Sequence, residues 1–260
     1  MRRVLIIAGS DPSGGAGIQA DLKAVTCLGG YGMTAITALT VQNTLGVTDV
    51  MPVPEAIITA QGRACLSDIG ADAIKTGMLG TIQVVETVAA LIDEAPDAFV
   101  VVDPVMVAKG GHPLLPSEAI SAIRSVLIPR AGLLTPNAPE AAVLTGIEVV
   151  DEASQRKAGE ALLELGAKAV LMKGGHIDGD EVVDWLMTPD GGERYSAKRV
   201  ETRHTHGTGC TLASACATLI TTERPLSESV GMARDYVLGA ILMAPNLGHG
   251  HGPLRHNWVL

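Results

Sequence analysis

Short apolar runs of strand length alternate with segments of helical periodicity along most of this chain, and this alternation limits the possible folds more than any other feature. Residues 3–8 and 99–102 are apolar runs that stop at turn-forming residues, whereas residues 18–28 and 117–127 repeat apolar positions with the helical period. No linker and no repeat of solenoid length interrupts the pattern. The sequence predicts one α/β domain over residues 1–260, with a doubly wound, mainly parallel sheet flanked by helices.

Residues 181–188 and 193–200 depart from this pattern, because apolar and polar side chains alternate in both. They are separated by Pro189-Asp190-Gly191-Gly192, which is typical of a turn. The sequence therefore predicts a small antiparallel hairpin there. Further strands are expected at residues 33–41, 73–75, 132–135 and 168–172, and further helices at residues 54–67, 81–93, 151–165 and 226–244.

The stretch from residue 204 to 220 carries the strongest chemical signal. Gly207 and Gly209 allow a tight turn, and a run of small and apolar helix-forming residues follows directly. The first turn of a helix has unpaired N–H groups and the positive pole of the helix dipole, so it attracts phosphate or a developing oxyanion. The short side chains of Thr208 and Cys210 would let a ligand lie against this backbone.

Cys210 is a candidate proton acceptor at the start of that helix. The helix dipole and the nearby His204 and His206 predict that its pKa lies below the ordinary thiol value of roughly 8.5. A thiol with a lowered pKa can take a proton near neutral pH. The alternative is that Gly-Thr-Gly forms a plain tight turn and that Cys210 is a small buried residue.

Composition limits the class of partner. The chain of 260 residues is 47% hydrophobic, which suffices for a sizeable core, and its longest apolar run, residues 237–244, is much shorter than the roughly 20 residues of a membrane span. The four cysteines form no Cys-x-x-Cys pair and no export-type leader is evident, so a reducing cytoplasm is expected. The sequence predicts a globular protein without a membrane partner.

The charge balance argues against nucleic acid as a partner. The 28 acidic and 19 basic residues give a formal charge of −9, and no basic run occurs. Only 2% of the residues are aromatic, so the stacking of bases on aromatic rings cannot be the main mode of recognition. A phosphorylated small molecule, held by a few local groups, remains compatible with this composition.

A glycine-rich loop at residues 9–17 connects the first predicted strand to the first helix. It has no Walker A lysine, and Ala20 stands where Gly-x-Gly-x-x-Gly would need its last glycine. We therefore expect the loop, including Gly9, to allow a small substrate close to the backbone, with Asp21 one helical turn further on. A plain turn between strand and helix is the alternative.

Other candidate ligand contacts follow the ends of predicted strands, where open α/β sheets bind ligands. The amide of Gln42 can both donate to and accept from the edge of a heteroaromatic ring. Met78 follows the strand at residues 73–75, although a methionine at such a position more often belongs to the core.

Acidic and basic side chains at later strand ends are candidates for metal and phosphate. Asp103 ends an apolar strand and could hold Mg²⁺ through water, and Asn137 and Glu140 at a helix start could order the ion and its waters. The alternatives are a turn at Asp103 and a helix cap at Asn137 and Glu140. Lys173 suits phosphate, although an exposed loop lysine is the ordinary case.

Two further segments are rich in glycine. Residues 107–113 contain a lysine and a histidine and are a candidate lid, with a solvated turn as the alternative. The tail at residues 249–253 contains two histidines and is expected to be disordered or loosely docked.

Seven motifs occur in order along nearly the whole chain: residues 8–23 (AGSDPSGGAGIQADLK), 42–44 (QNT), 75–79 (KTGML), 103–106 (DPVM), 135–141 (TPNAPEA), 172–176 (MKGGH) and 205–211 (THGTGCT). With these motifs the sequence resembles the ribokinase-like superfamily of ATP-dependent small-molecule kinases. More narrowly, it resembles the hydroxymethylpyrimidine/phosphomethylpyrimidine kinases of thiamine biosynthesis. The resemblance implies a ribokinase-like fold, ATP and Mg²⁺ as cofactors, and a homodimer.

The resemblance also implies a role for each candidate residue. Residues 207–210 would form the anion hole, with Cys210 where ribokinase has an aspartate base, so that positioning and electrostatic stabilisation carry most of the rate. Asp103 and Glu140 would hold Mg²⁺, and Lys173, Thr208 and Asn137 would hold the nucleotide. The substrate would be surrounded by Gly9, Asp21, Gln42, Met78, Val105 and Cys210.

The expected reactions are two phosphoryl transfers from ATP, first to 4-amino-5-hydroxymethyl-2-methylpyrimidine and then to its monophosphate. Gln42 would pair with a ring nitrogen and the exocyclic amine, much as glutamine reads adenine. A pyridoxal or pyridoxine kinase is the nearest alternative, because it differs mainly in its contacts to the ring. A non-catalytic sensor of pyrimidines or nucleotides is an alternative from another class.

Overall fold

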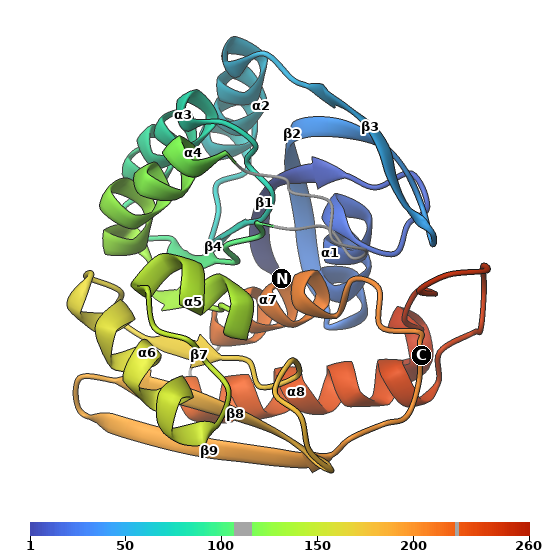
Figure 1. Cartoon of the computed structure of the whole chain (residues 1–260). Coiled ribbons are helices and arrows are strands. Elements are labelled where there is room, and N and C mark those ends of the chain that lie inside the picture. The colour runs from blue at the N-terminus through green and yellow to red at the C-terminus, as the bar shows by residue number, and fades with distance from the viewer. Residues whose placement is uncertain (107–115, 222–223) are drawn as a thin grey trace.

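The computed structural model describes residues 1–106, 116–221 and 224–260, and within them one sheet of nine strands runs through the molecule in the order β3-β2-β1-β4-β5-β6-β7-β8-β9 (Figure 1). The strands are β1 (Arg2–Ser10), β2 (Gly30–Asn43), β3 (Gly46–Pro52), β4 (Ala73–Thr76), β5 (Phe99–Val102), β6 (Leu133–Leu134), β7 (Val170–Met172), β8 (Glu181–Thr188) and β9 (Gly191–Lys198).

The pairing of the strands confirms the predicted sheet. β2, β1, β4, β5, β6 and β7 pair in parallel, whereas β3 at one edge and β8 and β9 at the other pair antiparallel. The interior strand β1 carries Val4, Leu5, Ile6 and Ile7 in succession, and none of them is exposed. A continuous apolar run is what a strand requires when helices cover both faces of the sheet.

Helices cover the two faces of this sheet in two separate layers (Figure 1). One face packs against α1 (Gly17–Cys27), α7 (Thr208–Ile220) and α8 (Leu226–Leu242). The other packs against α2 (Glu55–Asp68), α3 (Ile82–Asp93), α4 (Ser117–Ala122), α5 (Ala138–Thr145) and α6 (Glu152–Glu164). A π-helical turn over Ile123–Leu127 and a 3-10 turn over Ile128–Arg130 continue α4, and a 3-10 turn over His256–Val259 lies near the C-terminus.

The helix α3 shows how the sequence produces these elements. Thr81 caps its start, because the Thr81 hydroxyl accepts a hydrogen bond of 3.2 Å from the backbone N–H of Val84. Val84, Val88 and Leu91 recur three or four residues apart and are all buried. The capping signal and the apolar stripe therefore define a helix that packs one side on the sheet.

The structure differs from the prediction in two elements. The edge strand β3 was not expected; several of its side chains, such as Asp49 and Met51, are exposed, so it lacks the apolar pattern of a buried strand. The hairpin turn is shorter than expected, because Thr188 already pairs with Gly191 and leaves only Pro189 and Asp190 between the strands. The candidate lid at residues 107–113 lies outside the described residues.

The glycine-rich tail is docked rather than loose, which corrects the prediction. The N–H of His251 donates to the Thr44 carbonyl at 2.8 Å, and the N–H of His206 donates to the Gly252 carbonyl at 3.1 Å. A Cβ on Gly250 would overlap the backbone of Thr44, so the close contact depends on glycine. No helix in the described parts of the chain is long and apolar enough to span a membrane.

Candidate active site

A cavity of about 960 Å³ follows the carboxyl ends of the parallel strands. Its wall is formed by the segments after β1, β4, β5, β6 and β7 and by the first turn of α7, which is where open α/β sheets bind ligands. The predicted site residues that line it are Gly9, Gln42, Met78, Asp103, Val105, Asn137, Glu140, Lys173, Gly207, Thr208, Gly209 and Cys210. The fold thus brings together twelve side chains or backbone positions from distant segments.

Gly207 sets the start of α7. It is the N-cap residue with a φ of 82°, and a Cβ there would overlap the carbonyl oxygen of Gly15. Only glycine combines this left-handed backbone with so close an approach. The hydroxyl of Thr208 donates to the carbonyl of Thr205 at 2.8 Å, which turns the loop so that the first helical turn faces the cavity.

Lys173 places a positive charge directly over this helix start. A Cβ built on Gly209 would lie 3.2 Å from the Lys173 ammonium nitrogen and 3.8 Å from Oδ2 of Asp103. Burial lowers the pKa of Lys173, but the neighbouring carboxylates of Asp103 and Glu140 outweigh it and raise the pKa above its ordinary value. Lys173 is therefore protonated at neutral pH. Its positive charge and the positive pole of the α7 dipole both lie at the start of α7, where they would attract an anion.

Asp103 and Glu140 lie on either side of the Lys173 ammonium. The Lys173 nitrogen is 3.1 Å from Oδ1 of Asp103 and 3.8 Å from Oε2 of Glu140. The Thr135 hydroxyl donates to Oδ1 of Asp103 at 3.2 Å. Glu140 has its pKa raised to about 7 by burial and by Asp103, against the opposing effects of Lys173 and of the hydrogen bonds from Asn137.

Asn137 and Glu140 form the helix cap that was the alternative prediction for them. The N–H of Glu140 donates to Oδ1 of Asn137 at 2.9 Å, and the N–H of Asn137 donates to Oε2 of Glu140 at 2.8 Å. Both residues also line the cavity, so the cap fixes the position of the Glu140 carboxylate there. Within the described ranges, no cluster of three or more His, Cys, Asp or Glu side chains could enclose a metal ion.

The wall of the cavity near Gly9 is partly apolar. A Cβ on Gly9 would lie 2.6 Å from the terminal methyl carbon of Met78, so the methionine rests directly on the Gly9 backbone. Met78 therefore belongs to the cavity wall and not only to the core. Val105 and Gln42 also line the cavity, and Gln42 is half-buried next to the last residue of the strand β2.

Asp21 does not reach the cavity, which corrects its prediction as a substrate contact. Its side chain is fully buried, and both carboxylate oxygens lie 2.9 Å from the Lys75 ammonium nitrogen. The Ser214 hydroxyl also donates to Asp21 at 2.7 Å. Lys75, by contrast, lines the cavity, so Asp21 acts on the site through its ion partner and through its charge, not by contact with a ligand.

Cys210 is the second correction. Burial is the largest influence on its thiol and raises its pKa to about 12, although the Lys75 ammonium works in the opposite direction. The carboxylates of Asp21 and Asp103 raise the pKa further. The thiol is therefore neutral near pH 7, and the expected attraction of the helix dipole for a thiolate does not decide its state.

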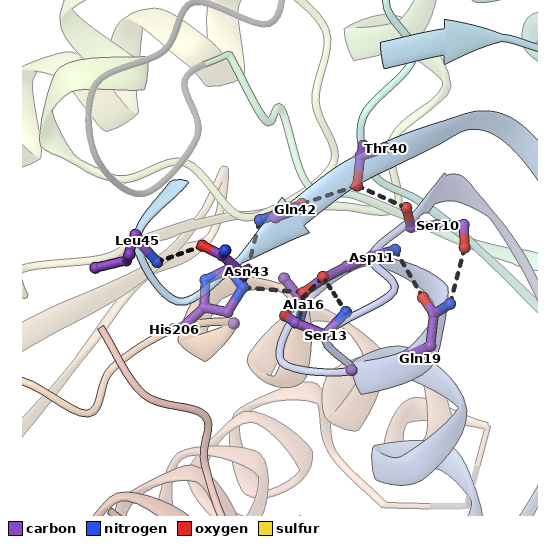
Figure 2. Close-up of polar contacts among 12 residues, drawn as sticks. Ser10, Asp11, Ser13, Ala16, Gln19, Thr40, Gln42, Asn43, Leu45 and His206 are labelled. Atoms are coloured by element: carbon purple, nitrogen blue, oxygen red, sulfur yellow. Dashed lines mark hydrogen bonds and ion pairs between the residues drawn. The ribbon is translucent and has the colours of Figure 1, made fainter. Parts of the chain in front are cut away.

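Sequence reasoning did not assign a role to the contact between Asp11 and His206. Oδ2 of Asp11 lies 2.9 Å from Nε2 of His206, and His206 Nε2 lies 3.4 Å from Nε2 of Gln42 (Figure 2). Asp11 belongs to the glycine-rich loop and His206 directly precedes Gly207, so both motifs were visible. Their contact joins positions 195 residues apart, which no local pattern reveals.

Comparisons with known proteins agree with this geometry. The family model for phosphomethylpyrimidine kinase matches residues 11–255. The chain is 45% identical to hydroxymethylpyrimidine/phosphomethylpyrimidine kinase of Haemophilus influenzae, over 98% of this chain and 97% of that protein. It is 49% identical, over 97% of its length, to the thiamine biosynthesis bifunctional protein ThiED of Geobacter sulfurreducens, of which it spans about half, 52%.

The fold is shared with solved kinases. The structure of an ADP complex of Bacillus subtilis pyridoxal kinase superposes with a TM-score of 0.93 at 36% sequence identity, and the match covers 100% of this chain and 98% of that one. A nucleotide thus occupies a relative with nearly the same backbone.

Proposed function

Because the chain belongs to the phosphomethylpyrimidine kinase family, we propose that it phosphorylates 4-amino-5-hydroxymethyl-2-methylpyrimidine with ATP and then phosphorylates the resulting monophosphate. Both steps belong to thiamine biosynthesis, the pathway for which the Geobacter relative is named. One observation carries the proposal: the Lys173 ammonium lies over Gly209 at the start of α7, in the same cavity as the amide of Gln42. A candidate site for an anion and a candidate site for a polar ring therefore lie in the same cavity.

The start of α7 would stabilise the phosphoryl group during transfer. The acceptor oxygen forms a bond to the γ-phosphorus while the bond between this phosphorus and the bridging oxygen breaks, and ADP leaves with that electron pair. In the first reaction the proton of the acceptor hydroxyl would pass to an oxygen of the transferred phosphoryl group, because the Cys210 thiol is neutral. Negative charge spreads over the oxygens of the transferred group, and backbone N–H groups in the stretch 207–210, together with the Lys173 ammonium, would balance it. The N–H of Thr208 already donates to the Thr205 carbonyl at 3.3 Å, so the other N–H groups of this stretch would carry most of that role. Thr208, on the same turn, would contact the phosphates of the nucleotide.

Cys210 contributes a neutral thiol and not a thiolate, because its pKa is raised to about 12. A group of this kind is a weak proton acceptor at neutral pH. Alignment of the hydroxyl with the phosphorus, and electrostatic stabilisation by the cavity, would therefore supply most of the rate. Cys210 would act mainly as part of the wall that holds the hydroxymethyl group.

The residues present fit a magnesium ion that is held largely by water and phosphate. Asp103 and Glu140 place two carboxylates beside Lys173, and Mg²⁺ commonly binds through one or two carboxylates while it keeps several waters. When bound, the ion would neutralise charge on the β- and γ-phosphates. Asn137 would support it indirectly, because its amide oxygen fixes the helix start that carries Glu140.

The nucleotide base would occupy the apolar extension of the cavity between β9 and α8. Ala197 and Val200 come from the region of β9, and Val237, Leu238 and Ile241 come from α8. All five line the cavity, and together they offer an apolar surface for a flat ring.

A coupled assay of ADP release tests the proposal. Purified protein with Mg-ATP is given the pyrimidine alcohol, its monophosphate or pyridoxal as the acceptor. We expect turnover of both pyrimidines. Turnover of the alcohol without turnover of the monophosphate would refute the second step.

Pyridoxal kinase is a second candidate function, favoured by the close superposition on the Bacillus subtilis enzyme. Gln42 distinguishes the two, because its amide can pair with the ring nitrogen and exocyclic amine of the aminopyrimidine. Gln42→Leu should weaken the binding of the aminopyrimidine more than the binding of pyridoxal. Equal losses for both acceptors would count against the pyrimidine assignment.

A non-catalytic sensor is tested with Cys210→Ala. An enzyme should lose part of its turnover while it still binds the pyrimidine and ATP. A sensor would bind both ligands without releasing ADP, whether or not the residue is changed.

We further propose a homodimer in the cytoplasm. Leu39, Val41 and Met51 are exposed on β2 and β3 at one edge of the sheet, which suits an apolar contact between two copies. The four cysteines are free, as expected in a reducing compartment. Analytical ultracentrifugation of the chain and of Val41→Asp tests the dimer, since a charge at the contact should shift the protein toward the monomer.

A further inference from the structure

The amide of Gln42 is held between two polar side chains (Figure 2). Its Nε2 lies 3.4 Å from Nε2 of His206, and its Oε1 lies 3.1 Å from the hydroxyl oxygen of Thr40. The hydrogen atoms on these two neighbours decide which end of the amide each of them prefers.

His206 must present a hydrogen atom at Nε2. Asp11 accepts hydrogen bonds from the N–H and hydroxyl of Ser13, at 2.8 and 2.7 Å, and from the N–H of Ala16 at 2.8 Å. Burial raises the pKa of Asp11, but these bonds and the one from His206 outweigh burial and lower it, so Asp11 is a carboxylate at neutral pH. A carboxylate only accepts, so the His206 nitrogen 2.9 Å away must donate to it.

Thr40 presents a lone pair to Gln42. Its hydroxyl donates to the carbonyl oxygen of Ser10 at 2.9 Å. The same hydroxyl also lies within donor distance of Oε1 of Gln42, at 3.1 Å, but it has one hydrogen atom. The shorter bond to Ser10 takes that hydrogen atom and leaves only acceptor capacity on the side of Gln42. One neighbour of the amide therefore offers a donor and the other offers an acceptor.

We infer that the Gln42 carboxamide, when ready for substrate, turns its oxygen toward His206 and its amino group toward Thr40, and that His206 is the positioning residue that fixes this orientation. A half-turn about the last side-chain bond exchanges the two ends, which are nearly equal in shape. It replaces the acceptor–acceptor contact at Thr40 with a hydrogen bond. At His206 it replaces a donor–donor contact with a favourable contact of 3.4 Å between the amide oxygen and the Nε2–H, whose one hydrogen atom is donated mainly to Asp11.

This orientation determines how the aminopyrimidine lies, and the step rests on the proposed function. The exocyclic amine would donate to the Gln42 oxygen on the side of His206, and the ring nitrogen would accept from the amino group on the side of Thr40. The carbon that bears the hydroxymethyl group is next to the carbon that bears the amine. The reacting oxygen is thereby directed toward Gly207, which directly follows His206 and begins the anion site. The opposite orientation of the amide would direct it away.

Nuclear magnetic resonance of the full chain labelled with ¹⁵N-histidine shows whether Nε2 of His206 carries a hydrogen atom. This measurement does not depend on enzyme activity. We expect the Nε2 signal of His206, assigned by its loss in His206→Gln, to show a bonded proton at neutral pH. A deprotonated Nε2 would overturn the inference, because it would accept from the Gln42 amino group as the amide stands.

A double-mutant cycle tests the positioning role through kcat/KM for the pyrimidine alcohol. His206→Leu should lower it roughly 10- to 100-fold, the range for loss of a polar contact, and leave the KM for ATP unchanged. In a Gln42→Leu background the same change should cost almost nothing, because the amide that it positions is gone. His206→Gln, which keeps a side-chain donor, should recover most of the activity.

His204→Leu is the matched control, because His204 is also buried, two residues away, and its Nδ1 has no hydrogen-bond partner among the described residues. His204→Leu should leave kcat/KM for the pyrimidine alcohol unchanged. Additive losses in the cycle would show a general structural role for His206 and overturn the inference. If the unaltered chain does not phosphorylate the pyrimidine, the proposed function itself is refuted, together with the substrate orientation.

Discussion

Lys75 and Asp21 form a fully buried ion pair beneath the candidate active site, with the ammonium nitrogen 2.9 Å from both carboxylate oxygens and neither side chain exposed. Burial alone would lower the pKa of Lys75, but the carboxylates of Asp21 and Asp103 raise it, so the lysine stays charged. The pair brings α1 to β4 and places a fixed positive charge at the cavity wall.

Lys75→Met should destabilise the protein by about 3–5 kcal/mol, because it leaves the Asp21 carboxylate buried without its counter-ion. Urea unfolding measures this loss. The double variant Lys75→Met with Asp21→Leu removes both charges and should recover much of it. A single variant as stable as the double one would show that the pair does not hold the fold.

Gly207→Ala should lower kcat by at least about 100-fold, the usual loss when one oxyanion donor is displaced. The new Cβ would overlap the carbonyl of Gly15, so the first turn of α7 must shift. Gly146→Ala is the matched control: its φ is 76°, close to the 82° of Gly207, but no atom lies within 4 Å of the added carbon. It should cost roughly 1–2 kcal/mol of stability and leave kcat unchanged. Equal kcat losses in both variants would remove the special role of Gly207.

The Cys210 thiol should remain protonated up to about pH 10, because its pKa is raised to about 12. The ultraviolet absorbance of thiolate, followed against pH, should be the same in the unaltered chain and in Cys210→Ser over that range. The buried Cys216, whose pKa is also raised to about 12, should add no thiolate signal there either. A signal near neutral pH that disappears in Cys210→Ser would restore the thiolate as the base.

The gathering of most candidate residues around one cavity could be predicted, because it depends on local patterns repeated at each strand end. Asp103 and Lys173 each follow a short apolar run, and parallel strands bring their carboxyl ends to one edge of the sheet. The turn at Gly207 and the helix after it are also predicted by a local sequence pattern. Knowledge of the strand order was not needed to expect these groups in one place.

The environment of each group could not be predicted, because it depends on residues far away in the sequence. Asp21 is buried by its pairing with Lys75, 54 residues further along the chain, and therefore does not line the cavity. The local argument from the helix dipole gave the wrong direction for the pKa of Cys210, because desolvation by the packed fold is the larger effect. The edge strand β3 was missed because its exposed side chains carry little apolar signal.

Glu140→Gln should make the protein more stable than the unaltered chain at pH 8, but not at pH 4. The pKa of Glu140 is raised from 4.5 to about 7, mainly by burial, so the folded state holds its proton more tightly than the unfolded state. The stability due to this proton is fully present below about pH 4.5 and is lost as the pH rises through about 7. Glutamine mimics the protonated form and can keep the cap with Asn137.

The expected difference between the two proteins grows by about 1–3 kcal/mol across this range, from roughly 1.4 kcal/mol for each unit of pKa. Urea unfolding at a series of pH values measures it. Glu164→Gln, at an exposed position at the end of α6, is the control for the loss of one carboxylate and should follow the unaltered chain. Parallel stability curves for the unaltered chain and Glu140→Gln would mean that Glu140 is ionised in the folded protein throughout, and that Lys173 outweighs burial at this position.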